Sequence, residues 1–270
     1  MVTLSKPNTV ELAARPATAP TPPYEIRHIG RAELVESLRQ GLADFNASPT
    51  FAIFLCVIYP VVGLLLARAT FSYGLIPLLF PAIAGFALLG PFAAIGLYEI
   101  SRLHEDGQPV TWRKAFGVIH AKSFVAILAL GAILVGIFSV WMVAADAIYV
   151  AFFGDDVPQS LTTLVQQILT TRAGWEMMIL GNVVGALFAI TAFAISVVSF
   201  PLLIDRNTDA ATAVATSLRA VTANPVAMVQ WGLIVAVALV LGSIPLLVGL
   251  AVVMPVLGHA TWHLYRKMVV

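Results

Sequence analysis

The sequence has little charge and almost no cysteine. Of its 270 residues, 11% are charged and 60% are hydrophobic, and the mean hydropathy is +0.93. So little polar surface excludes a water-soluble globule of this length and places the chain in a lipid bilayer. The one cysteine, Cys56, lies inside an apolar run, which excludes a disulfide framework and a thiolate metal cluster.

An excess of basic residues is also missing. The formal net charge is +1, whereas a protein that neutralises nucleic-acid phosphates needs a basic face. We therefore expect the lipid bilayer and other membrane proteins as partners, and no nucleic acid.

The first residues carry neither charge clusters nor an apolar block. Residues 1–23 contain five prolines among alanine and threonine and no stretch that could form the core of a signal peptide. This composition predicts a disordered cytoplasmic tail over residues 1–30. The remainder, residues 31–270, is predicted to be a single transmembrane domain.

Long apolar runs dominate the rest of the chain. A spanning helix needs about 20 apolar residues, and five blocks qualify: Phe51–Ala67, Leu75–Tyr98, Phe124–Val150, Met177–Leu203 and Val226–Trp262. The last block would extend roughly 55 Å as one helix, nearly twice the hydrocarbon core. It must fold back, and Gly242, Ser243 and Pro245 are where a helix breaks most easily. The fold class is thus all-α, a polytopic membrane protein with six transmembrane helices.

The basic residues predict the orientation of these helices. If the N-terminus is cytoplasmic, thirteen of the 15 Lys and Arg fall in cytoplasmic segments, and only Arg68 and Arg172 fall on the other side. Basic residues accumulate on the cytoplasmic side of membrane proteins. We expect a bacterial inner-membrane protein with both termini in the cytoplasm.

Amphipathic segments occupy the connections. In residues 31–45, Leu34, Leu38, Leu42 and Phe45 form one stripe, with Glu33, Glu36, Arg39 and Asp44 elsewhere. This helix lies either on the membrane surface or against the protein's own loops. Similar cytoplasmic helices are predicted near residues 112–119 and 210–221, the latter capped by Thr208 or Asp209. The outward connection predicts a short helix over residues 161–169 that begins near Pro158.

Parts of the sequence repeat. Pro91–Arg102 and Pro255–Arg266 share a proline, a small residue, an aromatic, an ionisable residue and an arginine at equal spacing, and Ser37-Leu38-Arg39 matches Ser217-Leu218-Arg219. These matches suggest three parallel two-span repeats, residues 31–104, 109–206 and 207–268. The alternative is chance similarity between apolar sequences.

Four runs near the ends of the predicted spans carry a family resemblance: GFALLGP at Gly85–Pro91, GLYEISR at Gly96–Arg102, PLLIDR at Pro201–Arg206 and GHATWHLYR at Gly258–Arg266. The chain resembles an uncharacterised family of predicted bacterial integral membrane proteins. Some members carry the label of cytochrome c oxidase subunits. The resemblance implies a membrane protein and supplies no catalytic residues.

The histidines test the oxidase label. A haem-copper core needs several histidines deep in the bilayer, but only His259 and His263 of the five histidines touch a predicted span. No cofactor is predicted. If the label applies, the chain is an accessory or assembly partner.

Two candidate sites remain. His259 and His263 share a helical face at i, i+4 and could bind a metal or haem edge, with Glu99 as a third ligand if the first and third units meet. The alternative is interfacial hydrogen bonding. Asp146 lies within a predicted span, where a carboxylate is costly, and Glu176 and Asn182 could face it. A hydrated position at the membrane surface is the alternative.

No catalytic residues are predicted. The sequence therefore favours a non-enzymatic membrane protein that acts as an accessory or assembly partner of a respiratory complex. The alternative is a small transporter or channel with a path near the proline-broken even-numbered spans, and a metal-dependent membrane enzyme comes third. A cavity shared by Glu99, His259, His263 and Asp146 would favour transport, and an apolar centre would favour the accessory protein.

Overall fold

The fold is that of a computed structural model, which describes residues 24–50, 53, 57, 61–65, 68, 75–115, 117, 121–206, 208–245 and 248–270. Within these ranges the chain is helical, and the β pairing is limited to one isolated bridge between Ile26 and Val269. The all-α prediction is confirmed. The elements are α1 (Arg31–Ala47), η1 (Ile76–Leu78), α4 (Leu79–Phe86), η2 (Ala87–Leu89), α5 (Gly90–Ala93), α6 (Ile95–Glu105), α7 (Trp112–Ala115), α8 (Phe124–Phe153), α9 (Leu161–Thr170), α10 (Arg172–Ser196), α11 (Ser199–Asp205), α12 (Ala210–Ala223), α13 (Pro225–Ser243) and α14 (Leu250–Met268).

Four helical runs in the described residues are long and apolar enough to span a membrane: Ile76–Glu105, Phe124–Phe153, Arg172–Asp205 and Pro225–Ser243. They correspond to the second, third, fourth and fifth predicted spans. The predicted first span, Phe51–Ala67, lies largely outside the described residues. The predicted sixth span corresponds to α14. This helix is not among the four runs, because its C-terminal half is polar. The count of six and the three repeats stay predictions.

The predicted break in the last apolar block is confirmed. Helix α13 ends at Ser243 and α14 begins at Leu250. The turn between them is tight, because a Cβ added to Gly249 would lie 2.6 Å from the Gly242 carbonyl oxygen. Glycine at position 249 therefore lets the two helices meet.

Prolines divide the second span. Instead of one helix, residues 76–105 form the series η1, α4, η2, α5 and α6. Pro77 and Pro91 each stand in the first positions of an element, where a missing N–H is tolerated. The span is therefore a series of short helical segments.

The fourth span is broken between α10 and α11. Pro201 has no N–H and its ring disfavours a helical carbonyl four residues before it, so the helix is interrupted at Val197 and Val198. Ser217 of α12 forms hydrogen bonds with backbone groups at this break. Its hydroxyl donates to the Ala194 carbonyl (2.7 Å) and accepts from the Val198 N–H (3.2 Å).

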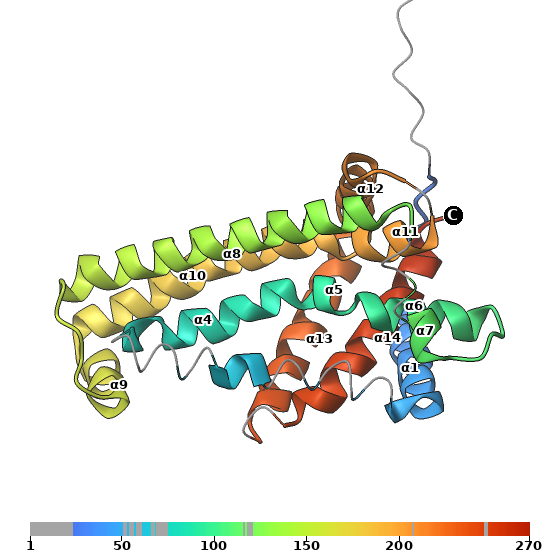
Figure 1. The fold of residues 1–270 in the computed structure, drawn as a ribbon. Helices are drawn as coiled ribbons and strands as arrows, with labels where there is room; N and C mark the ends of the chain where they lie inside the picture. The colour runs from blue at the N-terminus through green and yellow to red at the C-terminus, as the bar shows by residue number, and fades with distance from the viewer. Residues whose placement is uncertain are drawn as a thin grey trace, which may run out of the picture.

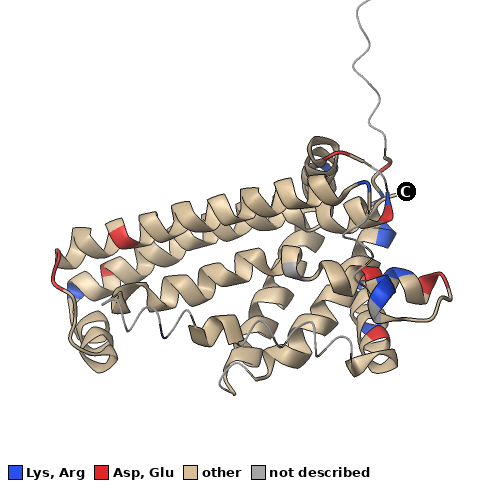
Figure 2. Ribbon diagram, viewed as in Figure 1, with Lys and Arg blue, Asp and Glu red and all other residues tan. Residues whose placement is uncertain are grey.

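The helices assemble into an elongated body (Figure 1). Helices α8 and α10 run side by side along its length, with α4 beside them and α9 at one end. Helices α13 and α14 cross this group obliquely, and α1 lies against α14. Most charged residues gather at the end opposite α9, where α1, α6, α11 and the C-terminal part of α14 meet (Figure 2). We call this the charged end.

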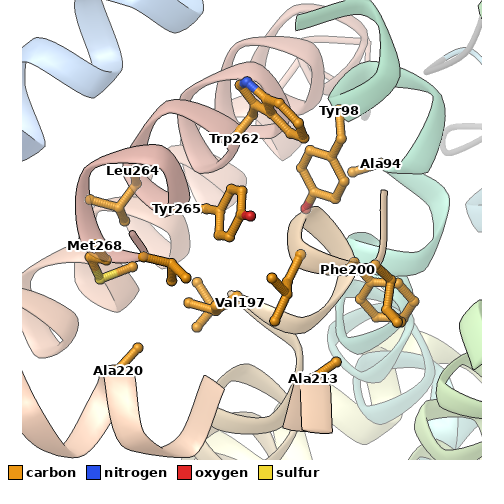
Figure 3. Close-up of a cluster of buried hydrophobic side chains, with 14 of the residues drawn as sticks. Ala94, Tyr98, Val197, Phe200, Ala213, Ala220, Trp262, Leu264, Tyr265 and Met268 are labelled. Atoms are coloured by element: carbon orange, nitrogen blue, oxygen red, sulfur yellow. The ribbon is translucent and has the colours of Figure 1, made fainter. Parts of the chain in front are cut away.

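The largest apolar core lies beside the charged end. Trp262 and Tyr265 of α14 point into the same cluster as Tyr98 of α6 and Phe200 of α11 (Figure 3). All four side chains are fully buried or nearly so. This cluster joins α6, α11, α12 and α14 and fixes the helix ends that carry the polar groups described below.

Helix α1 packs on helices α14 and α6, whereas the sequence pattern left open the membrane surface and the protein's own loops. Its buried residues are Leu34, Ser37, Gly41 and Asp44. The buried face is thus rotated by roughly 70° from the predicted leucine stripe, toward the small residues that allow close contact with α14. Asp44, expected on the polar side, is buried, and Leu42, expected in the stripe, is exposed.

The segment before α1 is bound along the charged end. The Arg27 N–H donates to the Met268 carbonyl (2.8 Å), and the Val270 N–H donates to the Glu25 carbonyl (3.1 Å). Asn224 also holds this segment, because its side chain accepts from the Ile29 N–H (2.8 Å). Residues 24–30, assigned from sequence to the tail, therefore belong to the folded part, while residues 1–23 lie outside the described residues.

The structure shows a helix in each of the three connections for which the sequence predicted one. Helix α12 begins after Asp209, whose carboxylate accepts from the Thr212 N–H (2.9 Å), as predicted. Helix α9 covers Leu161–Thr170, in agreement with the helix predicted over residues 161–169, and Ser160 caps its start by accepting from the Thr163 N–H. Helix α7 covers Trp112–Ala115, and most of the remaining residues of the helix predicted near 112–119 lie outside the described residues.

Candidate functional site

A buried carboxylate lies where three helices meet at the charged end. Asp44 comes from α1, and its side chain is 12% exposed. Its Oδ2 lies 2.6 Å from the Ser101 hydroxyl of α6 and 2.8 Å from His263 Nε2 of α14. Its Oδ1 lies 3.1 Å from His104 Nδ1, also of α6. One carboxylate therefore ties α1 to both α6 and α14.

The donors around Asp44 fix the position of several protons. An ionised carboxylate only accepts hydrogen bonds, so the Ser101 hydroxyl, His263 Nε2 and His104 Nδ1 all donate to it. Because the Ser101 hydroxyl directs its hydrogen at Asp44, its oxygen is left as an acceptor, and His259 Nδ1 donates to it from 2.8 Å. Each neutral imidazole is thus held in one tautomer.

His104 continues the chain outward to a serine. With its Nδ1 proton directed at Asp44, the neutral ring offers Nε2 as an acceptor. Nε2 lies 3.0 Å from the hydroxyl of Ser48, the residue that ends α1. Ser48 therefore donates to His104, and His104 donates to Asp44.

The interior of the α1 contact holds two polar atoms without a hydrogen-bond partner among the described residues, Ser37 Oγ and His259 Nε2. Both side chains are fully buried. By the proton assignment above, His259 Nε2 is an unprotonated acceptor. Leaving a buried polar atom without a hydrogen bond destabilises the folded state. The close packing of α1 on α14 offsets this cost.

The surroundings of Asp44 favour its charged form. Burial alone would raise the pKa of Asp44, but the hydrogen bonds from His263 and Ser101 lower the pKa below its ordinary value of 3.8. Asp44 is therefore a carboxylate at neutral pH, as the proton assignment requires.

A second polar network surrounds Asp205 at the end of α11. Asp205 Oδ2 accepts from the Tyr265 hydroxyl (2.6 Å), from Arg266 (3.1 Å) and from its neighbour Arg206 (3.0 Å). Arg266 also donates to Glu105 of α6 (3.0 Å). The network links α6, α11 and α14, so it has a structural role.

The predicted metal ligands are only partly brought together. His259 and His263 lie near Asp44, whereas the Glu99 carboxylate is paired with Arg102 of its own helix at 2.6 and 2.8 Å. The described residues contain no group of three or more His, Cys, Asp or Glu side chains placed to hold a metal ion. Metal or haem binding at the histidine pair stays a prediction without support from this geometry.

The residues of the second predicted site do not converge. Asp146 is exposed on α8. Glu176 pairs with Arg172 one turn away (2.7 Å), and Asn182 donates to the Met178 carbonyl of its own helix (2.8 Å). Among the described contacts, none joins one of these three side chains to another.

Two of the cavities among the described residues bear on a transport path. One of about 430 Å³ lies near α9 and is lined by apolar side chains, with Asn182 as a polar one. The other, of about 90 Å³, lies beside Tyr98 and Trp231. None of Glu99, His259, His263 and Asp146 lines either cavity.

The spacing of small and polar residues in α1 indicated that Asp44 is buried, but the prediction followed the leucine pattern instead. Residues 37, 41, 44 and 48 share one helical face by their spacing, and this face holds small and polar side chains rather than leucines. Ser48, Ser101 and His104 carried no comparable signal, because their partners lie 56 to 158 residues away along the chain.

The comparison with known families bears on the helices that frame this site. Residues 79–205 match the family described as "Predicted integral membrane protein (DUF2189)". The match runs from α4 through α11, and leaves α1 and α14 outside. No curated protein and no solved structure matches the chain. Together with the four membrane-spanning runs, the match identifies an integral membrane protein.

Proposed function

We propose that this chain binds other membrane proteins in a bacterial inner membrane, as an accessory or assembly partner of a membrane complex. Both termini lie in the cytoplasm in this proposal, because the charged end carries most of the basic residues. A respiratory complex is the favoured partner, and the resemblance to proteins labelled as oxidase subunits is the reason for it.

The apolar centre supports this function. Where the helices meet, the main buried cluster is apolar and includes Leu97, Leu130, Leu134, Val198 and Phe200. The buried acidic and histidine side chains among the described residues are Asp44, Glu99 and His259, on the helices of the charged end. A transport path requires polar groups along a cavity, and the four residues considered for such a path do not line the two cavities. This is the observation that favours a packing role over transport.

Exposed apolar side chains outside the spans offer contact surfaces. On α1, Val35 and Leu42 are 65% and 48% exposed and lie on the face turned away from α14. Large apolar groups exposed to water are costly unless a partner or the membrane covers them. Helix α9 has a second such row: Leu161, Val165 and Leu169.

Affinity purification from native membranes tests the proposal. A tagged chain solubilised in mild detergent should recover one or more membrane proteins in fixed ratio. A Val35→Asp, Leu42→Asp double variant should lose this recovery, whereas Val157→Asp, at an equally exposed position on the connection between α8 and α9, should keep it. A monodisperse chain without partners would contradict the proposal.

A further inference from the structure

We propose that Ser48, His104 and Asp44 form a nucleophilic serine site that reacts with carboxylic esters at the charged end. The three side chains stand in series: Ser48 Oγ lies 3.0 Å from His104 Nε2, and His104 Nδ1 lies 3.1 Å from Asp44 Oδ1. A nucleophile within reach of a base that a third group orients is the arrangement used for covalent catalysis. Such a triad is recognised by geometry and not by order in the sequence.

The direction of the hydrogen bonds suits this chemistry. Asp44 accepts the Nδ1 proton, which leaves the lone pair of His104 Nε2 pointing at the Ser48 hydroxyl. His104 can therefore take the hydroxyl proton as Ser48 attacks. The opposite tautomer would leave Nδ1 without a proton for Asp44, so the geometry selects the active form.

Asp44 is itself held in place from two other sides. Its second oxygen accepts from the Ser101 hydroxyl (2.6 Å) and from His263 (2.8 Å). The carboxylate is thereby fixed between α1, α6 and α14 and cannot rotate away from His104. A rigidly held third group is what a precise catalytic arrangement requires.

Exposure increases from the acid to the nucleophile. Asp44 is buried, the His104 side chain is 19% exposed, and Ser48 is partly exposed at the surface. A substrate can therefore reach the serine while the acid stays protected. Ser101, which also contacts a histidine, is fully buried and donates its hydrogen bond to Asp44 and not to a histidine, so it cannot act in the same way.

The reaction can be written in two balanced steps. Ser48 Oγ attacks the carbonyl carbon of an ester, and His104 takes its proton and passes it to the departing alkoxide. This step forms the Ser48 acyl ester and breaks the substrate's ester bond. Water then attacks the acyl group with His104 as base, which releases a carboxylic acid and restores Ser48.

This activity goes beyond the proposed binding of membrane proteins and was not expected from the sequence. The two are separable experimentally, because partner recovery depends on Val35 and Leu42 whereas acylation depends on Ser48. Loss of one leaves the other intact.

A fluorophosphonate probe on the purified full chain in detergent tests the site. Its phosphorus forms a bond with a nucleophilic serine oxygen while fluoride leaves. We expect covalent labelling, located on Ser48 by peptide mass spectrometry. Ser48→Ala should abolish labelling, and His104→Gln should slow it at least about 100-fold, the usual contribution of a general base. Ser160→Ala is the control, since Ser160 is exposed and the described hydrogen bonds of its hydroxyl are with Thr163, not with a histidine.

Asp44 is a positioning residue, and a pair of substitutions separates its role from folding. Asp44→Asn retains size but can donate to His104 Nδ1 and so favours the wrong tautomer. Asp44→Glu restores an acceptor. Labelling should fall at least about 10-fold in the Asn variant and recover in part in the Glu variant, at equal folded fractions by circular dichroism.

The outcomes decide the proposal. Labelling confined to Ser48, with turnover of p-nitrophenyl butyrate lost in Ser48→Ala, supports it. An unlabelled Ser48 in the folded wild-type chain overturns it. So does labelling that is unchanged by His104→Gln, because the serine would then react without its base.

Discussion

Gly41 of α1 lies directly on Ala260 of α14. A Cβ added to Gly41 would stand 2.5 Å from the Ala260 nitrogen and 2.7 Å from the Val256 carbonyl oxygen. Both are backbone atoms, which cannot rotate aside. This contact brings Asp44, one turn further along α1, within reach of His263 and His259.

Replacing Gly41 should loosen this contact. Gly41→Ala is expected to destabilise the protein by about 1–3 kcal/mol, since added volume in a tight contact forces the backbone apart. Thermal unfolding in detergent measures the effect. Gly136→Ala is the control, because a Cβ there meets no atom within 4 Å, and alanine favours a helix interior. Equal effects of the two substitutions would contradict the close contact.

The stability of the α1 contact should depend on pH through Asp44. Its pKa is lower in the folded state, so its contribution is present above the unfolded pKa of about 4 and is lost as the pH falls through the folded pKa. The difference in unfolding free energy between wild type and Asp44→Asn should thus be largest near pH 7 and shrink below about pH 4. A difference that stays constant from pH 3 to pH 7 would count against this role.

Asn224 should control the release of the segment before α1. Its side chain accepts from the Ile29 N–H and donates to the Arg27 carbonyl (3.1 Å). Asn224→Ala removes both of these partly buried hydrogen bonds, at a cost of about 0.5–1.5 kcal/mol for each. Limited trypsin digestion should then cleave after Arg27 faster than in wild type. Asn182→Ala, which removes a bond within one helix only, should leave the rate unchanged.

The proposed orientation predicts which loops face each side of the membrane. In a Cys56→Ser background, a cysteine at exposed Gln159 should react with a membrane-impermeant maleimide on intact cells. A cysteine at exposed Gln108 should react only after lysis. Reversed labelling would place the charged end outside and remove the basis of the cytoplasmic assignment.

Local sequence features were enough to predict many helix boundaries. Gly242, Ser243 and Pro245 marked the end of α13 because they disfavour helix continuation, and Asp209 marked the start of α12 because its carboxylate can cap N–H groups. These signals act within a few residues. They require no knowledge of the partner helix.

The contacts of α1 could not be predicted in the same way. Its leucines suggested one buried face, but the observed contact with α14 uses Ser37 and Gly41, because small residues let helix backbones approach closely. The choice between the two faces depends on the shape of α14, more than 200 residues away. The grouping of Ser48, His104 and Asp44 follows from that choice and was therefore not visible from the sequence.

The pairing of α1 with α14 also sets an order of assembly. Asp44 and His263 are 219 residues apart, and ribosomes add roughly 5–20 residues each second. Helix α1 therefore leaves the ribosome roughly 10–45 s before its partner exists. During this interval Asp44 lacks its histidine partner on α14, and Gly41 lacks its contact with Ala260. Helix α1 is therefore available to a chaperone or to the insertion machinery. Only the completed chain can form the contacts of the charged end.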